Sequence, residues 1–548
     1  MWNSPTLVSF SSRILIAFFG LYLCACSPEE ISQSPELPER PNVLFIMSDD
    51  HAYQAISAYD DRLLQTPQID RLAQEGMLFS NACVTNSICA PSRATILTGM
   101  HNHLNGKIDN HFPFDTTQLT FPQLFQEAGY QTAMFGKLHF GNNPKGVDEF
   151  MILPGQGNYI NPRFISPRGD TIIEGYVTDV ITDLTLDWLD AQRDTAQPFM
   201  MMYLHKAPHR PWWPRPDKFA EFTQRTFPEP PTLFDDYQGR GSAAREAEMN
   251  LLQHMMYEHD SKIRPELIDA MGSEVSPQVE EYNNGFYGPY GRANAAQMAL
   301  YDPILDSINL WFNNHWPQLN EQEKMRWKYQ RYMQDYLACI SSVDDNVGRV
   351  LDYLDESGLA ENTIVVYTSD QGFYLGEHGW FDKRFIYDES FKTPLLIRWP
   401  SVITPGTTED EMVQNLDFAQ TFLAAAGITA PAAMQGESLL PLMTGQKEDW
   451  KRDAVYYHYY EYPSVHMVKR HYGIVTKAYK LVHFYYDVDE WELYDRLADP
   501  QEMQNVYHDP AYTAVVENLQ VQLAEMRELY GDSPELDQYY IEQYLNRE

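Results

Sequence analysis

Short apolar runs alternate with segments of helical period over most of the chain that follows Pro41. The uninterrupted apolar runs predict buried strands, which lie at residues 42–47, 131–137, 198–206, 362–372 and 393–399. Between them, apolar residues three and four apart predict helices at residues 66–76, 121–129, 180–192 and 342–358. Strands separated by helices predict the α/β class, with a large, mostly parallel sheet covered by helices.

The pattern changes twice further along the chain. From about residue 230 to 330 the strands stop, and polar helical segments predict an insertion within a catalytic domain that spans residues 41–450. Residues 471–486 and 490–500 then predict antiparallel strands, and residues 511–529 predict a terminal helix. We therefore expect a smaller α+β subdomain at residues 451–548.

The N-terminal residues predict export. Arg13 precedes the apolar run ILIAFFGLYLCA, which is too short to cross a bilayer and is typical of a signal peptide over residues 1–25. The sequence LCAC places Cys26 as in a bacterial lipoprotein signal, and residues 26–40 form a polar, Pro-rich tether. The expectation is a protein held by a lipid on Cys26 at the outer membrane or in the periplasm, with no other membrane contact. The alternative is a simple cleaved signal in which Cys26 is incidental.

Charge and cysteine content narrow the function. A formal charge of -37 repels nucleic acid, so nucleic-acid binding is not expected. Of the five cysteines, Cys24 lies in the signal and Cys26 would carry lipid, which leaves Cys83, Cys89 and Cys339. These three form at most one disulfide, so at least one thiol in an oxidising compartment needs another explanation.

Polar side chains follow the carboxyl ends of the predicted strands, which is where proteins with parallel sheets bind their ligands. Asp49 and Asp50 follow one apolar run, Asp370 and Gln371 end another, and Lys137 and His205 lie at comparable positions. Carboxylate and amide oxygens suit a hard divalent cation such as Ca²⁺, and without one the carboxylates would raise one another's pKa. The alternative for the aspartate pair alone is a turn or a helix cap.

The segment CAPSRATILTG at residues 89–99 carries a specific signature. A cysteine followed by a variable residue, Pro, Ser and Arg resembles the motif of the type I, formylglycine-dependent sulfatases of the alkaline phosphatase-like superfamily. The resemblance extends over most of the mature chain, through SDDH at 48–51, GKLHFG at 136–141, HKAPHRPW at 205–212, TSDQGFYLGEHGWFDKR at 368–384 and LYDRLADPQEMQN at 493–505.

The resemblance implies a sulfuric ester hydrolase whose Cys89 a maturation enzyme converts to formylglycine (3-oxoalanine). The hydrated aldehyde would attack sulfur through one hydroxyl and expel sulfate when the other is deprotonated, which divides the displacement into two easier steps. Pro91 suits the first turn of a helix, whose N-terminus favours an anion. One Ca²⁺ per chain would be held by Asp49, Asp50, Cys89, Asp370 and Gln371.

The resemblance also implies roles for basic side chains. Arg93 would hold the diol and its neighbours, and Lys137 and Lys383 would bind sulfate oxygens. His139 would assist deprotonation of the diol, and His209 would protonate or hydrogen-bond the leaving oxygen. The candidate substrate contacts are His205, His378, Arg470 and His471. For His205, Arg470 and His471, a structural role is an equal alternative, and His378 would contact sulfate or orient Lys383.

The substrate is a sulfated carbohydrate in this interpretation. The segments 341–384 and 468–476 are similar to the branch with N-acetylglucosamine-6-sulfatases and bacterial ulvan sulfatases, so we expect a glycosaminoglycan or an algal polysaccharide. Two alternatives stay open: a phosphonate monoester or phosphodiester hydrolase of the same superfamily, and a carbohydrate-binding relative without activity.

Overall fold

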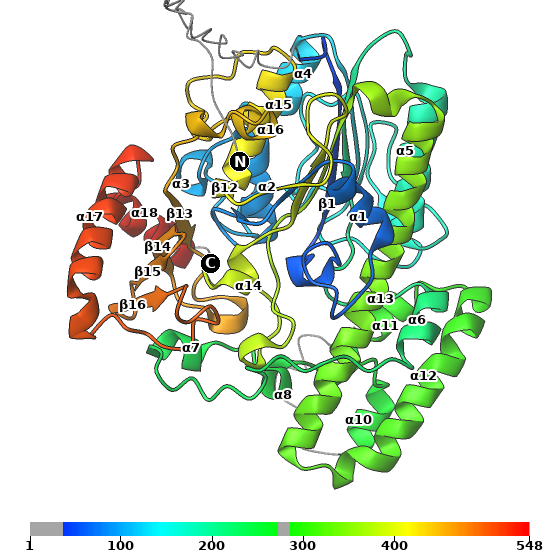
Figure 1. Cartoon of the computed structure of the whole chain (residues 1–548). Helices are drawn as coiled ribbons and strands as arrows, with labels where there is room; N and C mark the ends of the chain where they lie inside the picture. The colour runs from blue at the N-terminus through cyan, green and yellow to red at the C-terminus, as the bar shows by residue number, and fades with distance from the viewer. Residues whose placement is uncertain (1–36, 272–284, 547–548) are drawn as a thin grey trace, which may run out of the picture. The chain divides into compact units, whose positions relative to one another are not determined.

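An eight-stranded sheet lies at the centre of the computed structural model, which describes residues 37–271 and 285–546 (Figure 1). Its order is β11 (Thr407–Glu409), β2 (Met77–Phe79), β10 (Leu395–Arg398), β9 (Thr363–Ser369), β1 (Asn42–Ser48), β8 (Phe199–Leu204), β4 (Gln131–Lys137) and β5 (Glu149–Leu153). All neighbouring pairs are parallel except those of β10, which is antiparallel to β9 and β2. The predicted α/β class with a mostly parallel sheet is confirmed.

Alternating side chains of β1 fill a core on each face of the sheet. Leu44 and Ile46 belong to one core, and Val43, Phe45 and Met47 to the other. A strand buried on both faces has to be apolar throughout, which explains the uninterrupted apolar runs in the sequence.

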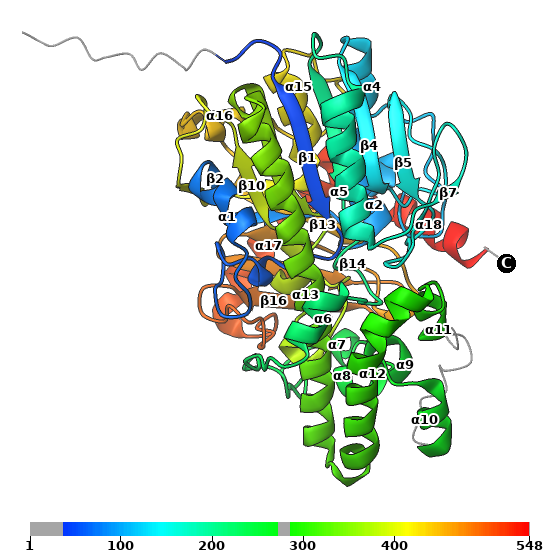
Figure 2. The ribbon, with the colours of Figure 1, turned by 90° about the vertical axis from the view of Figure 1, so that its right-hand side faces the viewer.

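Helices cover both faces of this sheet. On one side lie α1 (Pro67–Gln74), α5 (Val177–Asp187) and α13 (Glu321–Glu356), the last two in front of the sheet in Figure 2. On the other lie α2 (Cys89–Thr98), α4 (Phe121–Glu127), α15 (Phe418–Ala425) and α16 (Leu440–Met443).

One local expectation differs from the structure, and one helix begins at a cap from a distant side chain. The helical segment at 320–340 and the separate helix expected at 342–358 form one 36-residue helix, α13, which begins at a capping box of Asn320 and Glu323. The amides at the start of α1 are accepted by Asp344 of α13, at 3.0 Å from Gln68 and 2.8 Å from Ile69, and not by the Thr66 side chain. Capping is thus supplied by a distant side chain, which local sequence does not reveal.

The described part of residues 205–330 contains short helices joined by irregular segments, and one longer helix. Their helices are α6 (Pro216–Phe222), α7 (Ser242–Glu246), α8 (Leu251–His254), α9 (Tyr257–Asp260), α10 (Pro265–Met271), α11 (Tyr287–Tyr290) and α12 (Ala295–His315). We call residues 230–320 the helical insertion; α12 and the N-terminal half of α13 run together below the sheet in Figure 2.

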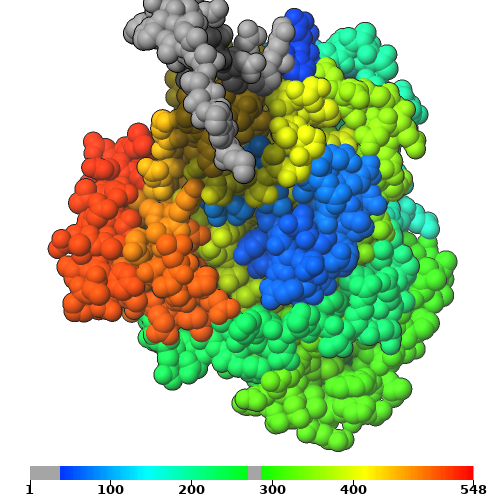
Figure 3. All heavy atoms as spheres, viewed as in Figure 1, coloured from blue at the N-terminus to red at the C-terminus, as the bar shows by residue number. Residues whose placement is uncertain are grey.

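The C-terminal residues form a second, antiparallel sheet of β13 (Ala454–Tyr459), β14 (His471–Thr476), β15 (Tyr479–Phe484) and β16 (Glu490–Asp495). One face packs on α17 (Thr513–Leu529), which α18 (Pro534–Leu545) follows, and the other packs on Phe385 and Tyr387. In Figure 3 its orange surface meets the green surface of the insertion, where Glu492 accepts the Gly241 amide at 2.7 Å. This sheet therefore supports the segment that contains Lys383.

The expectations for residues 1–36, including the signal peptide and the lipid on Cys26, lie outside the described residues. Among the described residues, no helix combines the length and apolar character that crossing a membrane requires.

The carboxyl ends of the central strands are level with one another. Ser48 pairs with Ser369, Met47 with Leu204, and Leu204 in turn with Gly136. The residues that follow each strand therefore meet along one edge of the sheet.

Gly136→Ala tests the close approach that positions Lys137. Gly136 has a φ of 112°, and a Cβ there would lie 1.7 Å from the Leu204 carbonyl oxygen of β8. We expect a loss of about 3 kcal/mol or more in the free energy of unfolding, measured by chemical denaturation. The control is Gly141→Ala, where φ is also positive but the space is open, at a cost of about 1 kcal/mol. Equal losses in the two variants would contradict this account.

Candidate active site

Cys89 is the first residue of α2 and is completely buried at the level edge of the sheet. Its Sγ lies 3.9 Å from Oδ1 of Asp50. Burial, followed by the charge of Asp49, raises the pKa of the Cys89 thiol well above its usual value. The unmodified side chain is therefore a protonated thiol and a poor nucleophile.

Asp49, Asp50, Asp370 and Gln371 lie around Cys89, as the strand-end positions predicted. The Asp50 amide donates to Oδ1 of Asp370 at 3.0 Å, and Gln371 Nε2 donates to Oδ1 of Asp50. All four side chains are fully buried. Gln371 Oε1 and both carboxylate oxygens of Asp49 accept no hydrogen bond within the described chain.

The carboxylates repel one another. Burial and the charge of Asp49 raise the pKa of Asp50 to about 6 and that of Asp370 to about 7, although Lys383 and Arg93 act in the opposite direction. Asp49 keeps a lowered pKa, because the charges of Lys137 and Arg93 outweigh its burial. Asp49, Asp50, Cys89 and His209 also form a group with metal-binding spacing. Clustered, buried carboxylate oxygens and the free amide oxygen of Gln371 fit an oxygen-liganded divalent cation.

Three cations face these carboxylates. Arg93 Nε and Nη2 donate to Oδ2 of Asp370 at 3.0 and 2.9 Å, and Nη2 lies 3.5 Å from Asp49. Lys137 Nζ contacts Asp49, and Lys383 Nζ contacts both oxygens of Asp50 at 2.6 and 2.7 Å. The three cations thus balance the three carboxylates at this edge of the sheet.

His139 and His209 lie beside Lys137 and Asp50. His209 Nδ1 faces the carbonyl of Arg210, which only accepts, so Nδ1 bears the proton and Nε2, 3.7 Å from Asp50 Oδ2, has a free lone pair. Burial and then the charge of Lys137 lower the pKa of both histidines well below the usual value. Both rings are therefore neutral, and each has a lone pair on one ring nitrogen.

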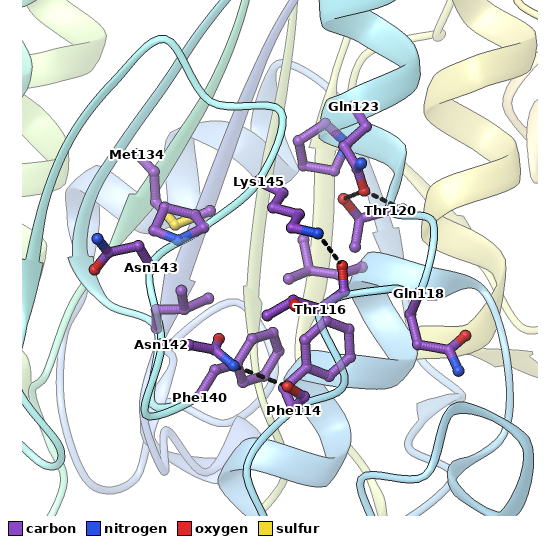
Figure 4. A pocket seen from close by; sticks show the side chains of 14 residues that line it. Phe114, Thr116, Gln118, Thr120, Gln123, Met134, Phe140, Asn142, Asn143 and Lys145 are labelled. Carbon is purple, nitrogen blue, oxygen red and sulfur yellow. Dashed lines mark hydrogen bonds between the residues drawn. The ribbon is translucent and has the colours of Figure 1, made fainter. Parts of the chain in front are cut away.

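The backbone around His139 is fixed by aromatic packing. Its neighbours Leu138 and Phe140 line an apolar cavity of about 20 Å³, and the ring of Phe140 stacks on Phe114 at 4.4 Å (Figure 4). Asn142 Nδ2 donates to the Phe114 carbonyl at 2.8 Å. The cavity has room for about one water molecule and is too small for a sugar.

The candidate substrate contacts differ in position. His205 is buried at the end of β8 with neither ring nitrogen hydrogen-bonded, and His378 Nδ1 faces Asp235 at 3.3 Å. The ring nitrogens of His471 are occupied by backbone groups, the Lys469 carbonyl at 2.8 Å and the Ile386 amide at 3.1 Å. Arg470 donates to the Tyr462 carbonyl at 3.0 Å and is fully buried. For His471 this geometry favours the structural alternative.

Other side chains at the site were missed from the sequence. Gln156 accepts from Lys137 Nζ, Tyr336 of α13 donates to the Asp50 carbonyl at 2.6 Å, and Asn110 accepts the Ala90 amide at 3.1 Å. Lys206 is buried with no hydrogen bond to Nζ, and burial lowers its pKa to about 7. Of these four residues, only Lys206 could have been identified from the sequence, because it lies within the HKAPHRPW segment.

Comparisons with known proteins agree with this arrangement. The sulfatase family model matches residues 41–428, and the model "N-sulphoglucosamine sulphohydrolase, C-terminal" matches residues 376–529. The chain is 44% identical over 530 residues to an N-acetylglucosamine-6-O-sulfatase of Bacteroides thetaiotaomicron, covering 95% of this chain and 92% of the relative. It is 23% identical over 547 residues to an ulvan-active sulfatase of Formosa agariphila, covering 97% and 89%.

Solved structures are also similar. One, in complex with its substrate D-glucosamine-2-N,6-O-disulfate, has a TM-score of 0.85 at 45% identity, covering 90% of this chain and 99% of the other. A phosphonate monoester hydrolase of Agrobacterium radiobacter has a TM-score of 0.61 at 20% identity, covering 90% and 96%, which is a likeness of fold alone.

Divalent cation binding should depend on pH in a defined direction. Since the folded pKa values of Asp50 and Asp370 exceed their unfolded values, protonation of these groups stabilises the cation-free protein as pH falls through 7 and 6. Protons then compete with the cation. We expect Ca²⁺ to raise the melting temperature more at pH 8 than at pH 5.5.

Asp370→Asn should reduce the Ca²⁺-dependent shift in melting temperature at pH 8. The matched control is Asp344→Asn, because burial also raises the pKa of Asp344 to about 7 but its oxygen caps α1. A shift that does not vary with pH, or that persists in Asp370→Asn, would refute the cation site.

Proposed function

This chain belongs to the sulfatase family, and we propose that it removes 6-O-sulfate from glucosamine or N-acetylglucosamine residues of a sulfated glycan. The chain is a sulfuric ester hydrolase, and its substrate is of the glycosaminoglycan type. The proposal adds the position of the sulfate, a formylglycine at Cys89 and Ca²⁺ as the cation.

The main support for the proposal is that Cys89 lies beside carboxylates and cationic side chains at one buried edge of the central sheet. The Asp50 carboxylate contacts both Cys89 Sγ and Lys383 Nζ there. The chain is also 44% identical, over 95% of its length, to a relative named for this activity. The structure with TM-score 0.85 holds a glucosamine sulfated at the 2-N and 6-O positions, which supports an amino sugar.

The proposed reaction needs two groups that the unmodified chain lacks, an oxidised Cys89 and a bound Ca²⁺. Oxidation of Cys89 to an aldehyde, which hydrates to a diol, provides a nucleophile that ordinary side chains do not offer. Ca²⁺, held by Asp49, Asp50, Asp370 and Gln371, would offset the repulsion among the carboxylates and draw charge from sulfate oxygens. The buried Gln371 Oε1, which accepts no hydrogen bond in the described chain, and the clustered carboxylates support this assignment.

The chain's own residues position charge and protons. Lys137 and Lys383, now paired with Asp49 and Asp50, would turn to sulfate oxygens once the cation binds the carboxylates. Arg93 would hold Asp370 in place through its two hydrogen bonds. Preorganised donors of this kind stabilise the charge that develops on sulfate in the transition state.

The two histidines divide the proton transfers. His209, whose unprotonated Nε2 lies beside Asp50, would take up the proton that the attacking hydroxyl loses as its bond to sulfur forms, and would pass it to the sugar oxygen as the bond from sulfur to that oxygen breaks. His139, beside Lys137 and neutral, would accept the proton of the second hydroxyl when sulfate leaves.

Export and maturation complete the proposal. A formylglycine-generating enzyme would modify Cys89, and a lipid on Cys26 would hold the protein at the outer membrane or in the periplasm. Support comes from the CAPSR motif and the LCAC sequence. Mass spectrometry of the peptide that spans Cys89 from the native host tests the modification, and an unmodified thiol there would contradict it.

Activity on defined substrates tests the reaction. The enzyme matured with a formylglycine-generating enzyme should release sulfate from N-acetylglucosamine-6-sulfate and D-glucosamine-2-N,6-O-disulfate faster than from ulvan oligosaccharides. Cys89→Ala should show no turnover, because the nucleophile is absent. Ion chromatography of free sulfate is the measurement. Faster cleavage of phenyl phosphonate than of sulfate esters would instead favour a phosphonate hydrolase, and substrate binding without release would favour an inactive carbohydrate-binding protein.

Lys383→Ala should lower kcat on the order of a hundredfold, since one charged donor to the transition state contributes about 3–4 kcal/mol. Lys392→Ala is the matched control: it lies in the same segment but pairs with Asp388 at 3.0 Å. Steady-state kinetics on N-acetylglucosamine-6-sulfate measures both variants. A Lys383→Ala loss no greater than that of the control would remove Lys383 from the proposed site.

A further inference from the structure

We propose that Asp260 of the helical insertion and Tyr159 are positioning residues for His209, and that they set its ability to protonate the leaving sugar oxygen. The inference rests on the proposed function, and no motif in the sequence pointed to either residue. Both side chains bind the backbone or side chain of the turn that contains His209.

Asp260 fixes the residue that follows His209. Its oxygens accept from Nε and Nη2 of Arg210, each at 2.6 Å, in a two-point contact. Asp260 is fully buried and also accepts the Met256 amide at 2.7 Å, which fastens it to the insertion. Burial opposes its charge, but the charge of Arg210 and the hydrogen bond from His259 hold its pKa well below the usual range. The guanidinium of Arg210 therefore has a fixed place.

That placement determines the hydrogen bond of the His209 ring. The carbonyl of Arg210 accepts the proton on His209 Nδ1, so the position of Arg210 sets the tautomer and the orientation of the imidazole. Arg210 also lies over the ring of Phe381 at 5.2 Å, two residues before Lys383. The insertion thus connects the two loops that contain His209 and Lys383.

Tyr159 fixes the other side of the same turn. Its hydroxyl donates to the His209 carbonyl at 2.7 Å, and the ring lies 4.6 Å below Lys206 Nζ. The Lys206 carbonyl in turn accepts the His209 amide at 3.0 Å. The peptide groups around His209 are held from both directions, so Nε2 can keep one position relative to Asp50.

If Asp260 and Tyr159 orient His209 for proton transfer, their variants should behave differently from variants that only lower stability. Departure of a sugar alkoxide needs a proton, whereas 4-nitrophenolate leaves readily without one. A small displacement of His209 should therefore slow the sugar substrate selectively. A purely structural defect would reduce both rates in proportion to the folded fraction.

The experiment compares Asp260→Asn and Tyr159→Phe on N-acetylglucosamine-6-sulfate and 4-nitrophenyl sulfate. We expect kcat on the sugar to fall about tenfold or more with little change in KM, while kcat on 4-nitrophenyl sulfate stays within about twofold. Tyr159→Phe removes one oxygen atom only and keeps the ring below Lys206, so it remains informative if Asp260→Asn folds poorly.

Two matched controls come from the same surroundings. Asp306→Asn breaks an ion pair with Arg264 in the insertion, measured at 2.5 Å, and Tyr176→Phe removes the hydroxyl of a buried ring that stacks on Tyr159 at 5.9 Å. Both should keep the wild-type ratio of the two rates. Thermal unfolding of each variant gives its folded fraction.

His209→Gln separates the possible failures. If His209→Gln slows the sugar selectively but Asp260→Asn and Tyr159→Phe slow both substrates equally, the positioning roles are wrong and the proposed function stands. If His209→Gln itself slows both substrates equally, His209 is not the acid and that part of the proposed function fails. Absence of sulfate release by the unaltered enzyme would refute the proposed function as a whole.

Discussion

The repulsion among Asp49, Asp50 and Asp370 is the constraint around which this site is built. Three carboxylates that share one buried edge oppose folding unless positive charge meets them, and Arg93, Lys137 and Lys383 supply it. Each cation comes from a different part of the chain: a helix N-terminal turn, a strand end and a loop supported by the C-terminal sheet. The charge balance therefore requires the main sheet, α2 and the C-terminal sheet to assemble together.

The sequence predicted the chemistry at strand ends better than the contacts of the loops. Asp49, Asp370 and Lys137 were found because parallel strands place their following residues at one edge, a rule that depends only on topology. The antiparallel direction of β10 could not be predicted in this way, because an apolar run does not indicate which way its strand runs in the sheet. Long α13 was divided in the prediction because polar residues near 341 interrupt the pattern, although tertiary packing continues the helix.

Contacts between distant segments explain what was missed. Nothing near Gln156, Asn110 or Tyr336 in the sequence indicates that they meet Lys137, Ala90 and Asp50, because those pairings arise only from the fold. For His471 the sequence left a sugar contact and a structural role equally open, and the fold favours the structural role because the backbone of Lys469 and Ile386 occupies its ring. Residue type limits possible chemistry, whereas partners decide which chemistry is available.

Helix α13 links the helical insertion to the active-site edge of the central sheet. At about 1.5 Å per residue its 36 residues extend for roughly 54 Å, and Lys328 near one end binds the carbonyls of Leu252 and Met255 in the insertion. Nearer its middle, Tyr336 holds the carbonyl of Asp50. The same helix therefore fixes the insertion and the backbone of Asp50 at once, and a change in the tilt of α13 would alter both contacts together.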